Sequence, residues 1–360
     1  MNNTLLVDGH YLLKRSFLVK SNYYTHEFGN ISGLFNFFLT LRTLTKELKI
    51  NKLIVFFDGE NGGKQRHNIY PGYKSKRKNK SWYDKINLSE AEIKREQESK
   101  ESLLKTKVRI QQYLEELFIR QLSVEFIEAD DLIAYYCKLY HTTENITIFT
   151  NDRDLCQLIQ YDTVKLYLAN KKIIITKDNY FLHFNHYYKN LSLIKTFCGD
   201  NSDDIKGICG LKETTFLKLF PKAINEEMFI DEVIESAKLI KEERSKDKKL
   251  KPLLVLDEII DGVPMYNKKN EKRIALGRDF YSINYEIINL KEPMLTKEAK
   301  YEVENIATIE LDDSDRGSKN LLRLMKEDGF MKVWNGSIND FCLPFYPVIL
   351  KEKEYLKNNK

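Results

Sequence analysis

Short apolar runs that lead into acidic residues recur along the first part of the chain. The runs at 4–7, 53–57, 124–127 and 146–149 each end next to at least one carboxylate, and a further pair lies in a Gly-Asp-Asn-Ser-Asp loop. Carboxylates are strongly solvated and repel one another, so several can share a site only when a cation neutralises them. The nine acidic residues of these five groups are Asp8, Asp58, Glu128, Asp130, Asp131, Asp152, Asp154, Asp200 and Asp203.

Helix-like segments separate these runs from one another. Apolar residues recur at helical spacing over 32–49 and again over 103–118, and another strand-like run lies at 164–168. This alternation is typical of βαβ units and predicts an α/β fold, with a central, mostly parallel twisted sheet flanked by helices. The carboxyl ends of parallel strands meet at one crevice, where open α/β sheets bind ligands. We therefore expect the acidic groups to lie together.

Carboxylate oxygens crowded at one edge of a sheet suit Mg²⁺ or Mn²⁺. Two such ions about 4 Å apart can activate a water molecule and stabilise the leaving oxygen in an in-line phosphoryl displacement. The structural alternative, in which these residues are helix caps and surface ion pairs, requires all five placements to be coincidental. No residue is suited to act as a covalent nucleophile, so direct attack by water is the simplest mechanism.

The segment 60–102 interrupts the alternation and predicts an insertion above the sheet. From Lys64 to Lys80 it holds seven Lys or Arg residues and no Asp or Glu, interleaved with aromatic residues, and 89–101 is almost devoid of apolar residues. Such a segment cannot contribute much core, so we expect it to be mobile. Cations neutralise phosphates and an aromatic ring stacks on any base, which favours nucleic-acid binding. A solvated basic loop is the alternative.

Composition limits the partners and the compartment. The formal charge of +5 is modest, but a basic face beside an acidic crevice would suit a polyanion held by its phosphates. A Lys-rich solvated surface explains the same composition. The five cysteines form no Cys-x-x-Cys pair, and the N-terminal apolar run is interrupted by Asp8. We therefore expect reduced cysteines and a cytoplasmic protein without a signal peptide or a membrane span.

Five motifs carry a resemblance to a known family. Their order and spacing resemble those of the flap endonuclease / 5′ nuclease superfamily over residues 4 to about 220, and most of all the phage ribonuclease H-type 5′-3′ exonucleases. The motifs are Asp8-Gly9, Phe57-Asp58-Gly59, Glu128-Ala129-Asp130-Asp131, Thr150-Asn151-Asp152-Arg153-Asp154 and Gly199-Asp200-Asn201-Ser202-Asp203-Asp204.

The resemblance implies two divalent ions in one active site. The first would be held by Asp8, Asp58, Glu128 and Asp130, with Asp131 bound directly or through water. The second would be associated with Asp152, Asp154, Asp200 and Asp203. Asp8 and Asp130 thereby count as catalytic residues, together with two basic residues of the insertion, Lys74 and Arg77.

The resemblance also implies an arch and a duplex-binding element. Arg66, Tyr73, Lys74 and Arg77 match the family's arch, a helical insertion through which a single-stranded 5′ end passes and whose basic residues contact the scissile phosphate. Arg15 matches a further phosphate-binding position.

Residues 205–220 resemble the helix–three-turn–helix element that grips the duplex backbone, with Gly207 and Gly210 close to phosphate and Lys206 and Lys212 as cations. Lys212 and Thr214 depart from the family's Gly and basic residue, which puts its bound monovalent cation in doubt. A plain helical hairpin is the alternative.

These observations predict a metal-dependent 5′ nuclease with exonuclease and flap endonuclease modes. We expect a monomer that acts on flapped, nicked or branched DNA and on RNA–DNA hybrids, with a single-strand-binding protein or a clamp as replication partners. The expected divisions are a catalytic domain at 1–190, the helix–three-turn–helix at 191–220 and a mainly helical region at 221–360. The alternatives are a PIN-type ribonuclease and a non-catalytic protein that binds branched DNA.

Overall fold

A six-stranded sheet forms the centre of the molecule. The computed structural model describes residues 1–18, 24–25, 29–75, 90–246, 253–262, 279–306 and 316–358. The strand order is β5-β4-β1-β6-β7-β8, and every pair is parallel except β7 with β8. The mostly parallel α/β sheet predicted from the sequence is therefore confirmed. The strands are β1 (Asn2–Asp8), β4 (Lys52–Phe56), β5 (Arg120–Leu122), β6 (Glu144–Thr150), β7 (Val164–Leu168) and β8 (Ile173–Ile175).

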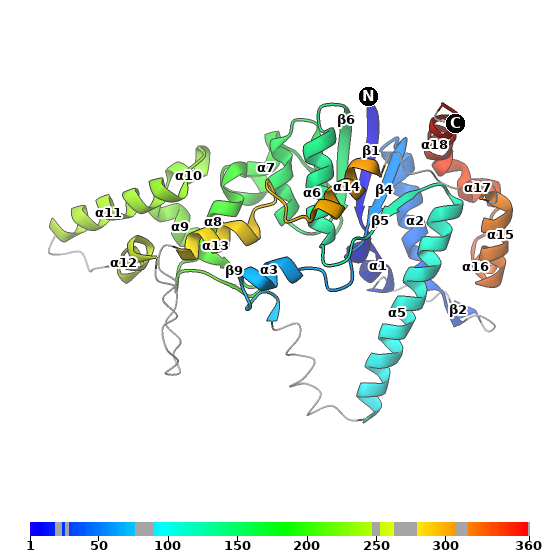
Figure 1. Cartoon of the computed structure of the whole chain (residues 1–360), viewed down its shortest axis with the longest axis horizontal. Helices are drawn as coiled ribbons and strands as arrows, with labels where there is room; N and C mark the ends of the chain where they lie inside the picture. The colour runs from blue at the N-terminus through cyan, green and yellow to red at the C-terminus, as the bar shows by residue number, and fades with distance from the viewer. Residues whose placement is uncertain are drawn as a thin grey trace.

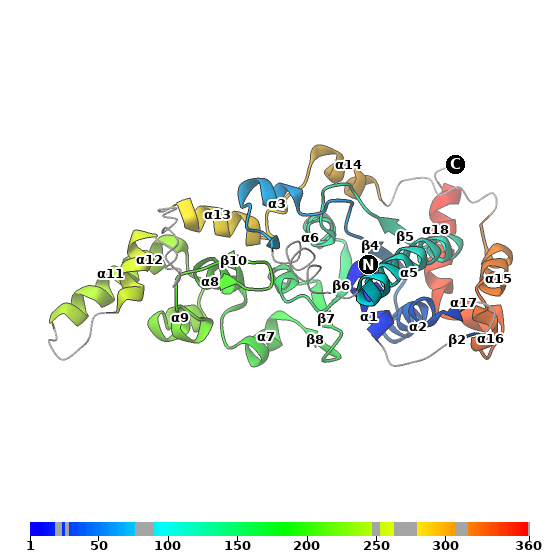
Figure 2. The ribbon, with the colours of Figure 1, turned by 90° about the horizontal axis from the view of Figure 1, so that it is seen from below.

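Alternating side chains of the central strands enter two separate cores. On β1, Leu5 and Val7 belong to one core and Leu6 to the other, as the two-residue period of a strand requires. Because both faces are buried, helices must cover both of them. One face is covered by α1 (Gly9–Leu18), α2 (Ser32–Glu47) and the base of α5 (Glu90–Glu116), and the other by α6 (Ala129–Tyr140), η1 (Asp154–Gln160) and α14 (Lys297–Asn305) (Figure 2).

A second helical unit lies beside the sheet and has its own core, at the left of Figure 1. It is joined to the sheet through α7 (Lys177–Phe184) and η2 (Tyr188–Asn190) and carries the small hairpin of β9 (Gly199–Asp200) and β10 (Ile205–Lys206). Its helices are α8 (Leu191–Cys198), α9 (Glu213–Leu219), α10 (Lys222–Asn225), α11 (Ile230–Lys246), α12 (Leu254–Asp261) and α13 (Asp279–Ile288).

The last helices return to the sheet and brace α5. They pack on α2 and α5 through an aromatic cluster that includes Phe38, Tyr113, Phe330 and Phe341. Asp328 ties them to α5 because it accepts a hydrogen bond from the Tyr113 hydroxyl at 2.9 Å and pairs with Arg109 at 3.0 Å. These elements are α15 (Ser318–Glu327), α16 (Phe330–Val333), α17 (Ile338–Cys342), η3 (Leu343–Phe345) and α18 (Tyr346–Asn358).

The helices beyond residue 220 therefore lie at different places. Those between 222 and 288 join the second unit, α14 covers the sheet next to α6, α15 to α17 and η3 pack on α2 and α5, and α18 lies against β4 and β5. The region is mainly helical, as the sequence predicts, but its helices do not share one core. The boundaries expected at 190 and 220 stay predictions. No helix within the described ranges is long and apolar enough to span a membrane.

The predicted strand at 124–127 is wrong. Strand β5 lies earlier, at Arg120–Leu122, and 124–127 forms a turn in which Phe126 has a φ of +68°. The apolar pattern was misleading because these residues pair with the loop after β4: Phe126 N–H donates to Glu60 O at 2.8 Å, and Gly59 N–H donates to Ile127 O at 2.9 Å.

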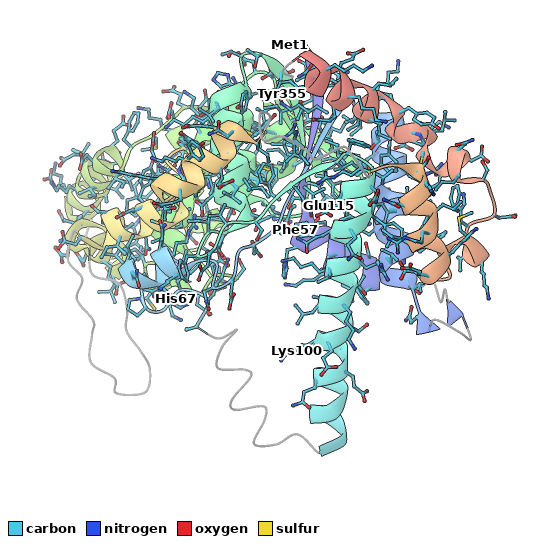
Figure 3. The ribbon with its side chains drawn as sticks, turned by 45° about the vertical axis from the view of Figure 1, so that its right-hand side comes forward. Met1, Phe57, His67, Lys100, Glu115 and Tyr355 are labelled. Carbon is cyan, nitrogen blue, oxygen red and sulfur yellow. The ribbon has the colours of Figure 1, made fainter. Side chains whose placement is uncertain are left out.

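The expected insertion at 60–102 has two described legs. Helix α3 (Lys64–Ile69) is the first, and α5, which begins at Glu90 and so extends far beyond the predicted 103–118, is the second. In Figure 3 the half of α5 that carries Lys100 projects beyond the body of the protein, with α3 and His67 across from it. The mobility expected for this insertion stays a prediction, and residues 76–89 lie outside the described residues.

Gly59 offers a test of the turn that links β4 to 124–127. A Cβ atom at position 59 would lie 1.7 Å from the carbonyl oxygen of Val124, so the two segments could no longer touch. We expect Gly59→Ala to lower the free energy of unfolding by about 1–3 kcal/mol, measured by urea denaturation. Gly336→Ala, where the nearest atom is the end of a Trp334 side chain at 3.0 Å, is the control. Equal stability losses would contradict this account.

Candidate metal centre and nucleic-acid interface

Three neighbouring parallel strands bring the first carboxylates together. Asp8 ends β1 and lies level with Phe56 of β4, which is followed two residues later by Asp58. On the other side of β1, strand β6 leads into Asp152, and helix α6 begins beside them with Asp130 and its neighbours in its first turn. The predicted acidic groups of the sheet therefore share one edge, because parallel strands end on the same side.

Helix N-termini orient two of these carboxylates. Asp8 Oδ1 accepts the backbone N–H of Tyr11 at 2.9 Å, in the first turn of α1, and Asp8 Oδ2 accepts the Thr150 hydroxyl at 3.2 Å. Asp58 Oδ1 accepts the N–H of Ala129 at 2.9 Å, at the start of α6. Unpaired N–H groups at a helix start favour negative charge, so both side chains are held in one direction before any ligand arrives.

Asp130 lies where the negative charges converge. Burial raises its pKa well above the ordinary value, and the charges of Asp152, Asp8, Asp58 and Glu128 raise it further. Burial, together with the charges of Asp58 and Asp152, raises the pKa of Asp8 to about 7. Asp130 makes no ion pair or hydrogen bond with a described side chain. These carboxylates are short of positive charge, and a divalent cation would supply it.

The remaining carboxylates of the first set already have cationic partners. Glu128 pairs with Arg66 at 2.9 Å, accepts the Tyr73 hydroxyl at 2.8 Å and forms a short contact with the Lys74 ammonium. Burial alone would raise the pKa of Glu128, but Lys74 and Arg66 outweigh it and hold the pKa below its usual value. Asp131 is fully buried and is bound twice by Arg66 and once by the N–H of Met294 at 3.0 Å.

The predicted roles of Arg66 and Tyr73 look different in this geometry. Both side chains are buried, and their polar groups point at Glu128, Asp131 and Asp203. The two side chains hold these carboxylates in place through hydrogen bonds, and their contact with nucleic acid stays a prediction. Both carboxylate oxygens of Asp131 likewise accept hydrogen bonds from Arg66, which favours an indirect role toward a metal over direct ligation.

A lysine that the sequence analysis did not single out neutralises the second set. Lys195 of α8 forms a short contact with Asp154 and pairs with Asp200 at 2.6 Å. Burial raises the pKa of Asp154 to about 7, with Asp152 adding to the shift and Lys195 opposing it. Burial alone would raise the pKa of Asp200, but Lys195 and Ser202 lower it below the usual value. Asp203 lies nearer the first set, 3.8 Å from the Lys74 ammonium.

Lys74 joins the two sets. Its backbone adopts a φ of +50°, an unusual conformation for a residue with a Cβ, and its N–H donates to Asp203 O at 2.8 Å. Burial alone would lower the pKa of Lys74, but Glu128 and Asp203 outweigh it and raise it. Its ammonium is therefore charged and lies between carboxylates of both sets. Arg77, its predicted companion, lies outside the described residues.

Arg15 stands at the rim of the site. Its guanidinium donates to Asn170 Oδ1 at 2.6 Å and to the Tyr11 hydroxyl at 3.2 Å, and it is half-buried. Asn170 lies in the turn after β7, so sequence spacing gave no sign of it. The predicted phosphate contact of Arg15 stays a prediction, with the guanidinium already held in place by two neutral groups.

The predicted duplex-binding element is only partly open. Lys206 and Lys212 are exposed, and Gly210 has a φ of +77° with open space where a Cβ atom would lie. Gly207 has another use, because a Cβ atom there would lie 2.1 Å from the carbonyl carbon of Cys198. Its bare backbone lets the hairpin close on α8. Phosphate binding by this element stays a prediction.

Within the described ranges no three of the acidic, cysteine or histidine side chains already surround one point as an ion's ligands would. Most of the carboxylates instead contact Arg66, Lys74, Lys195 or the N–H groups at helix starts. The donor set nevertheless fits a hard divalent cation, since it is made of carboxylates. No described cationic side chain pairs with Asp8 or Asp130, so their negative charge is left for a cation to balance.

A parallel sheet with carboxylates gathered at the ends of its central strands is an arrangement suited to phosphoryl transfer. The family model of the 5′-3′ exonuclease, N-terminal resolvase-like domain, matches residues 3–185. A 5′-3′ exonuclease of Mycoplasmopsis pulmonis is 29% identical over 303 residues, which cover 83% of this chain and 90% of that protein. The chain belongs to the 5′-3′ exonuclease family, whose members are hydrolases of phosphodiester bonds.

Further relatives agree with this membership. A 5′-3′ exonuclease of Buchnera aphidicola subsp. Schizaphis graminum is 28% identical over 222 residues, 59% of this chain and 68% of that protein. The solved structure of the phage T5 5′-exonuclease with bound zinc has the same fold, with a TM-score of 0.60 at 16% identity over 91% of this chain and 98% of that chain.

The raised pKa of Asp8 predicts a pH-dependent instability of the metal-free protein. Between its ordinary pKa of 3.8 and about 7, the folded protein keeps a proton that the unfolded chain has lost, so stability falls as pH rises through this range. Asp8→Asn removes this penalty and can still accept the Tyr11 N–H. The variant's stability advantage should grow by about 1 kcal/mol from about pH 6 to about pH 8, measured by urea unfolding in EDTA. Parallel pH profiles of the two proteins would refute it.

Lys195 predicts a second test, on ion binding without nucleic acid. Its ammonium fills the space that Asp154 and Asp200 would offer to a cation. Of two bound Mn²⁺ ions, the one with the lower affinity should therefore bind several-fold more tightly to Lys195→Gln than to the unchanged protein. Mn²⁺ titration followed by electron paramagnetic resonance measures this. Lys189→Gln is the matched control, because Lys189 pairs with Glu227 instead. Unchanged or weaker Mn²⁺ binding by Lys195→Gln would show that the lysine does not compete with an ion.

Proposed function

We propose that this protein is a divalent-metal-dependent 5′ nuclease that cleaves phosphodiesters near junctions between single strand and duplex. It has both a 5′→3′ exonuclease and a flap endonuclease mode. The observation that carries the proposal is the gathering of Asp8, Asp58, Glu128 and Asp152 around the buried Asp130 at the ends of adjacent parallel strands, where burial and their charges raise the pKa of Asp130 well above its usual value. A chain that only bound nucleic acid would gain nothing from this repulsion.

The first set of carboxylates, with Asp8, Asp58, Glu128 and Asp130, would hold one Mg²⁺ or Mn²⁺, and Asp152, Asp154, Asp200 and Asp203 a second. When bound, such ions activate water and stabilise the leaving oxygen. The protein's part is orientation: Asp8 and Asp58 are fixed by the starts of α1 and α6. Arg66 holds Asp131 beneath them, so the carboxylates need little rearrangement.

Lys74 would move between two partners during the reaction. In the metal-free protein its ammonium neutralises Glu128 and Asp203. With a divalent ion held by these carboxylates, the Lys74 ammonium would be free to donate to an oxygen of the scissile phosphate, where negative charge develops. Its backbone bond to Asp203 keeps it at the site throughout. Arg77 would assist from the same segment, as the sequence predicts.

The substrate would cross the site between the insertion and the second helical unit. A single-stranded 5′ end would pass the insertion whose legs are α3 and α5, and duplex would lie along the hairpin and α9, near the exposed Lys206, Lys212 and Lys218. A phage T5 flap endonuclease structure described as a pseudo-enzyme-product complex with DNA and metal ions has this fold, with a TM-score of 0.59. This likeness supports DNA as the substrate.

The biological task we propose is the removal of RNA primers or displaced flaps during replication. A PIN-type ribonuclease is less well supported, because it would lack both the insertion at 60–102 and the hairpin before α9. A silent branch-binding protein would have no reason to keep all nine carboxylates. The five free cysteines suit a cytoplasmic setting.

One assay tests this function. A 5′-labelled flap and an RNA-primed duplex are incubated with the protein in Mg²⁺ or in EDTA, and the products are sized. We expect cleavage near the junction only in Mg²⁺. Asp130→Asn should reduce the rate by at least about 10³-fold while flap binding persists.

Asp178→Asn is the matched control, since Asp178 also lies in the first turn of a helix but is exposed and belongs to neither set of carboxylates. It should cleave normally. Cleavage in EDTA, or full activity of Asp130→Asn, would overturn the metal assignment. Cleavage of single strands alone would overturn the junction specificity.

A further inference from the structure

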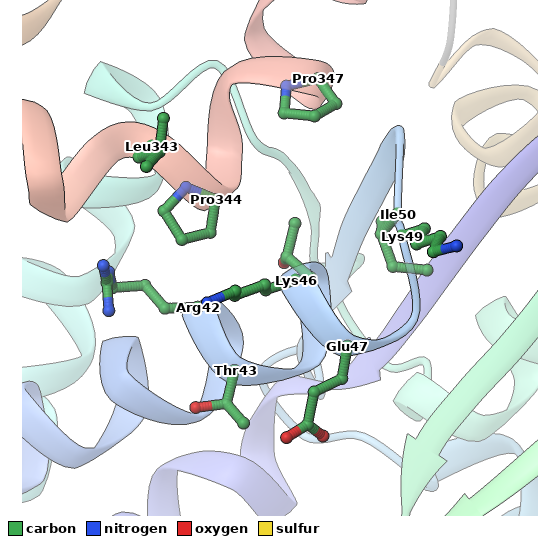
Figure 4. A pocket seen from close by; sticks show the side chains of 10 residues that line it. Arg42, Thr43, Lys46, Glu47, Lys49, Ile50, Leu343, Pro344 and Pro347 are labelled. Atoms are coloured by element: carbon green, nitrogen blue, oxygen red, sulfur yellow. The ribbon is translucent and has the colours of Figure 1, made fainter.

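A cavity lies at the edge of the molecule opposite the carboxylates. It has a volume of about 620 Å³ and opens between the C-terminal end of α2 and the turn that leads into α18 (Figure 4). Ile50, in its wall, precedes β4, whereas Asp58 follows that strand, so a length of strand of roughly 20 Å separates the cavity from the metal centre. A ligand here would leave the nucleic-acid site open.

One wall of the cavity is apolar and rigid. It is formed by Leu343, Pro344 and Pro347, and the Leu343 side chain is 62% exposed. The two prolines restrict the backbone of this turn. Phe345 and Val348 alternate with them and are fully buried in the core, so the wall is anchored from behind. The exposed apolar surface is thus preformed for contact with another apolar side chain.

The facing wall is basic. Lys46 and Lys49 are exposed and have no ion-pair partner among the described residues, and Glu47 is the acidic residue in the lining. In Figure 4 the side chains of Lys46 and Glu47 leave the helix in different directions, with Lys46 toward the turn that holds Pro344. Arg42 is already used, since its guanidinium donates to Phe341 O at 2.8 Å and lies 4.4 Å from the Trp334 ring centre.

A buried hydroxyl in the lining is also without a partner. Thr45 is 2% exposed, and its Oγ1 makes no hydrogen bond among the described atoms. Two other threonines of the same helix behave in the ordinary way: Thr40 donates to Asn36 O at 2.8 Å and Thr43 to Leu39 O at 2.9 Å. Buried polar groups are nearly always satisfied, so Thr45 is an exception next to the cavity, although its hydroxyl is covered and ligand binding in the cavity does not depend on it.

We propose that this cavity binds a short acidic peptide segment of a partner protein. A bulky apolar side chain of the peptide packs against Leu343 and the two prolines, and neighbouring carboxylates pair with Lys46 and Lys49. The volume suits a few side chains and lies in the usual range of binding pockets. Nucleic acid is disfavoured as the occupant, because the described lining offers only these two unpaired cations and half of the wall is apolar. Such a partner would hold the nuclease while it cleaves.

The test uses fluorescein-labelled hexapeptides and the whole chain. Each peptide has four Asp residues and two apolar residues, which are Leu, Ile, Phe or Trp. One group of control peptides carries Asn in place of Asp, and the other carries Ala in place of the apolar residues. We expect at least one acidic apolar peptide to bind with a Kd below about 1 mM by anisotropy, more weakly at high salt. Both kinds of control peptide should bind at least about tenfold more weakly.

The site is located by matched charge reversals. Lys46→Glu with Lys49→Glu should weaken peptide binding by at least about tenfold, while flap cleavage without peptide stays unchanged. Lys297→Glu with Lys300→Glu, an equal charge change on exposed positions of α14, should leave peptide binding intact. Leu343→Asp should also abolish binding.

Failure of every acidic apolar peptide, or equal losses in both double variants, would overturn the proposal. Stronger binding of a single-stranded oligonucleotide than of any peptide, lost in Lys46→Glu with Lys49→Glu, would assign the cavity to nucleic acid instead. None of these outcomes depends on catalysis, so they are separate from a failure of the nuclease assay.

Discussion

Repulsion among carboxylates is the constraint on which the rest of this structure depends. Parallel strands end side by side, and this chain places Asp8, Asp58 and Asp152 at those ends with Asp130 between them. The fold tolerates the charge because helix starts, Arg66, Lys74 and Lys195 neutralise parts of it. What they leave unbalanced, at Asp8 and Asp130, is negative charge that a divalent cation would balance.

The same internal cations link stability with activity. Lys74 and Lys195 pair with carboxylates that we propose as ligands of the ions, and these ion pairs offset part of the repulsion among them. In the proposed mechanism, ion binding would free these cations where a phosphate would arrive, so one exchange of partners would prepare both the metal site and the substrate site. Asp328, with its bonds to Tyr113 and Arg109, ties the base of α5 to the last helices, while the outer half of α5 projects beyond the body of the protein (Figure 3).

Local patterns predicted much of the fold and the members of the site. Short apolar runs separated by helix-like segments predicted β1, β4, β6 and β7, because buried parallel strands read as short, continuous apolar stretches. The same apolar pattern wrongly predicted a strand at 124–127. An apolar run indicates contact with the core, and this run makes that contact as a turn against the loop at Gly59, with only Ile127 fully buried and without joining the sheet. Helix α5 was underestimated because its outer half has no apolar face to detect.

The sequence by itself determined which carboxylates exist, their order along the chain and the α/β class that brings strand ends together. Only the tertiary structure decided how each one is balanced. Lys195 meets Asp154 across two elements, Arg66 is buried under Asp131, and Gly207 closes against Cys198. Spacing along the chain cannot reveal such pairs, because Coulomb and packing energies depend on distance in space.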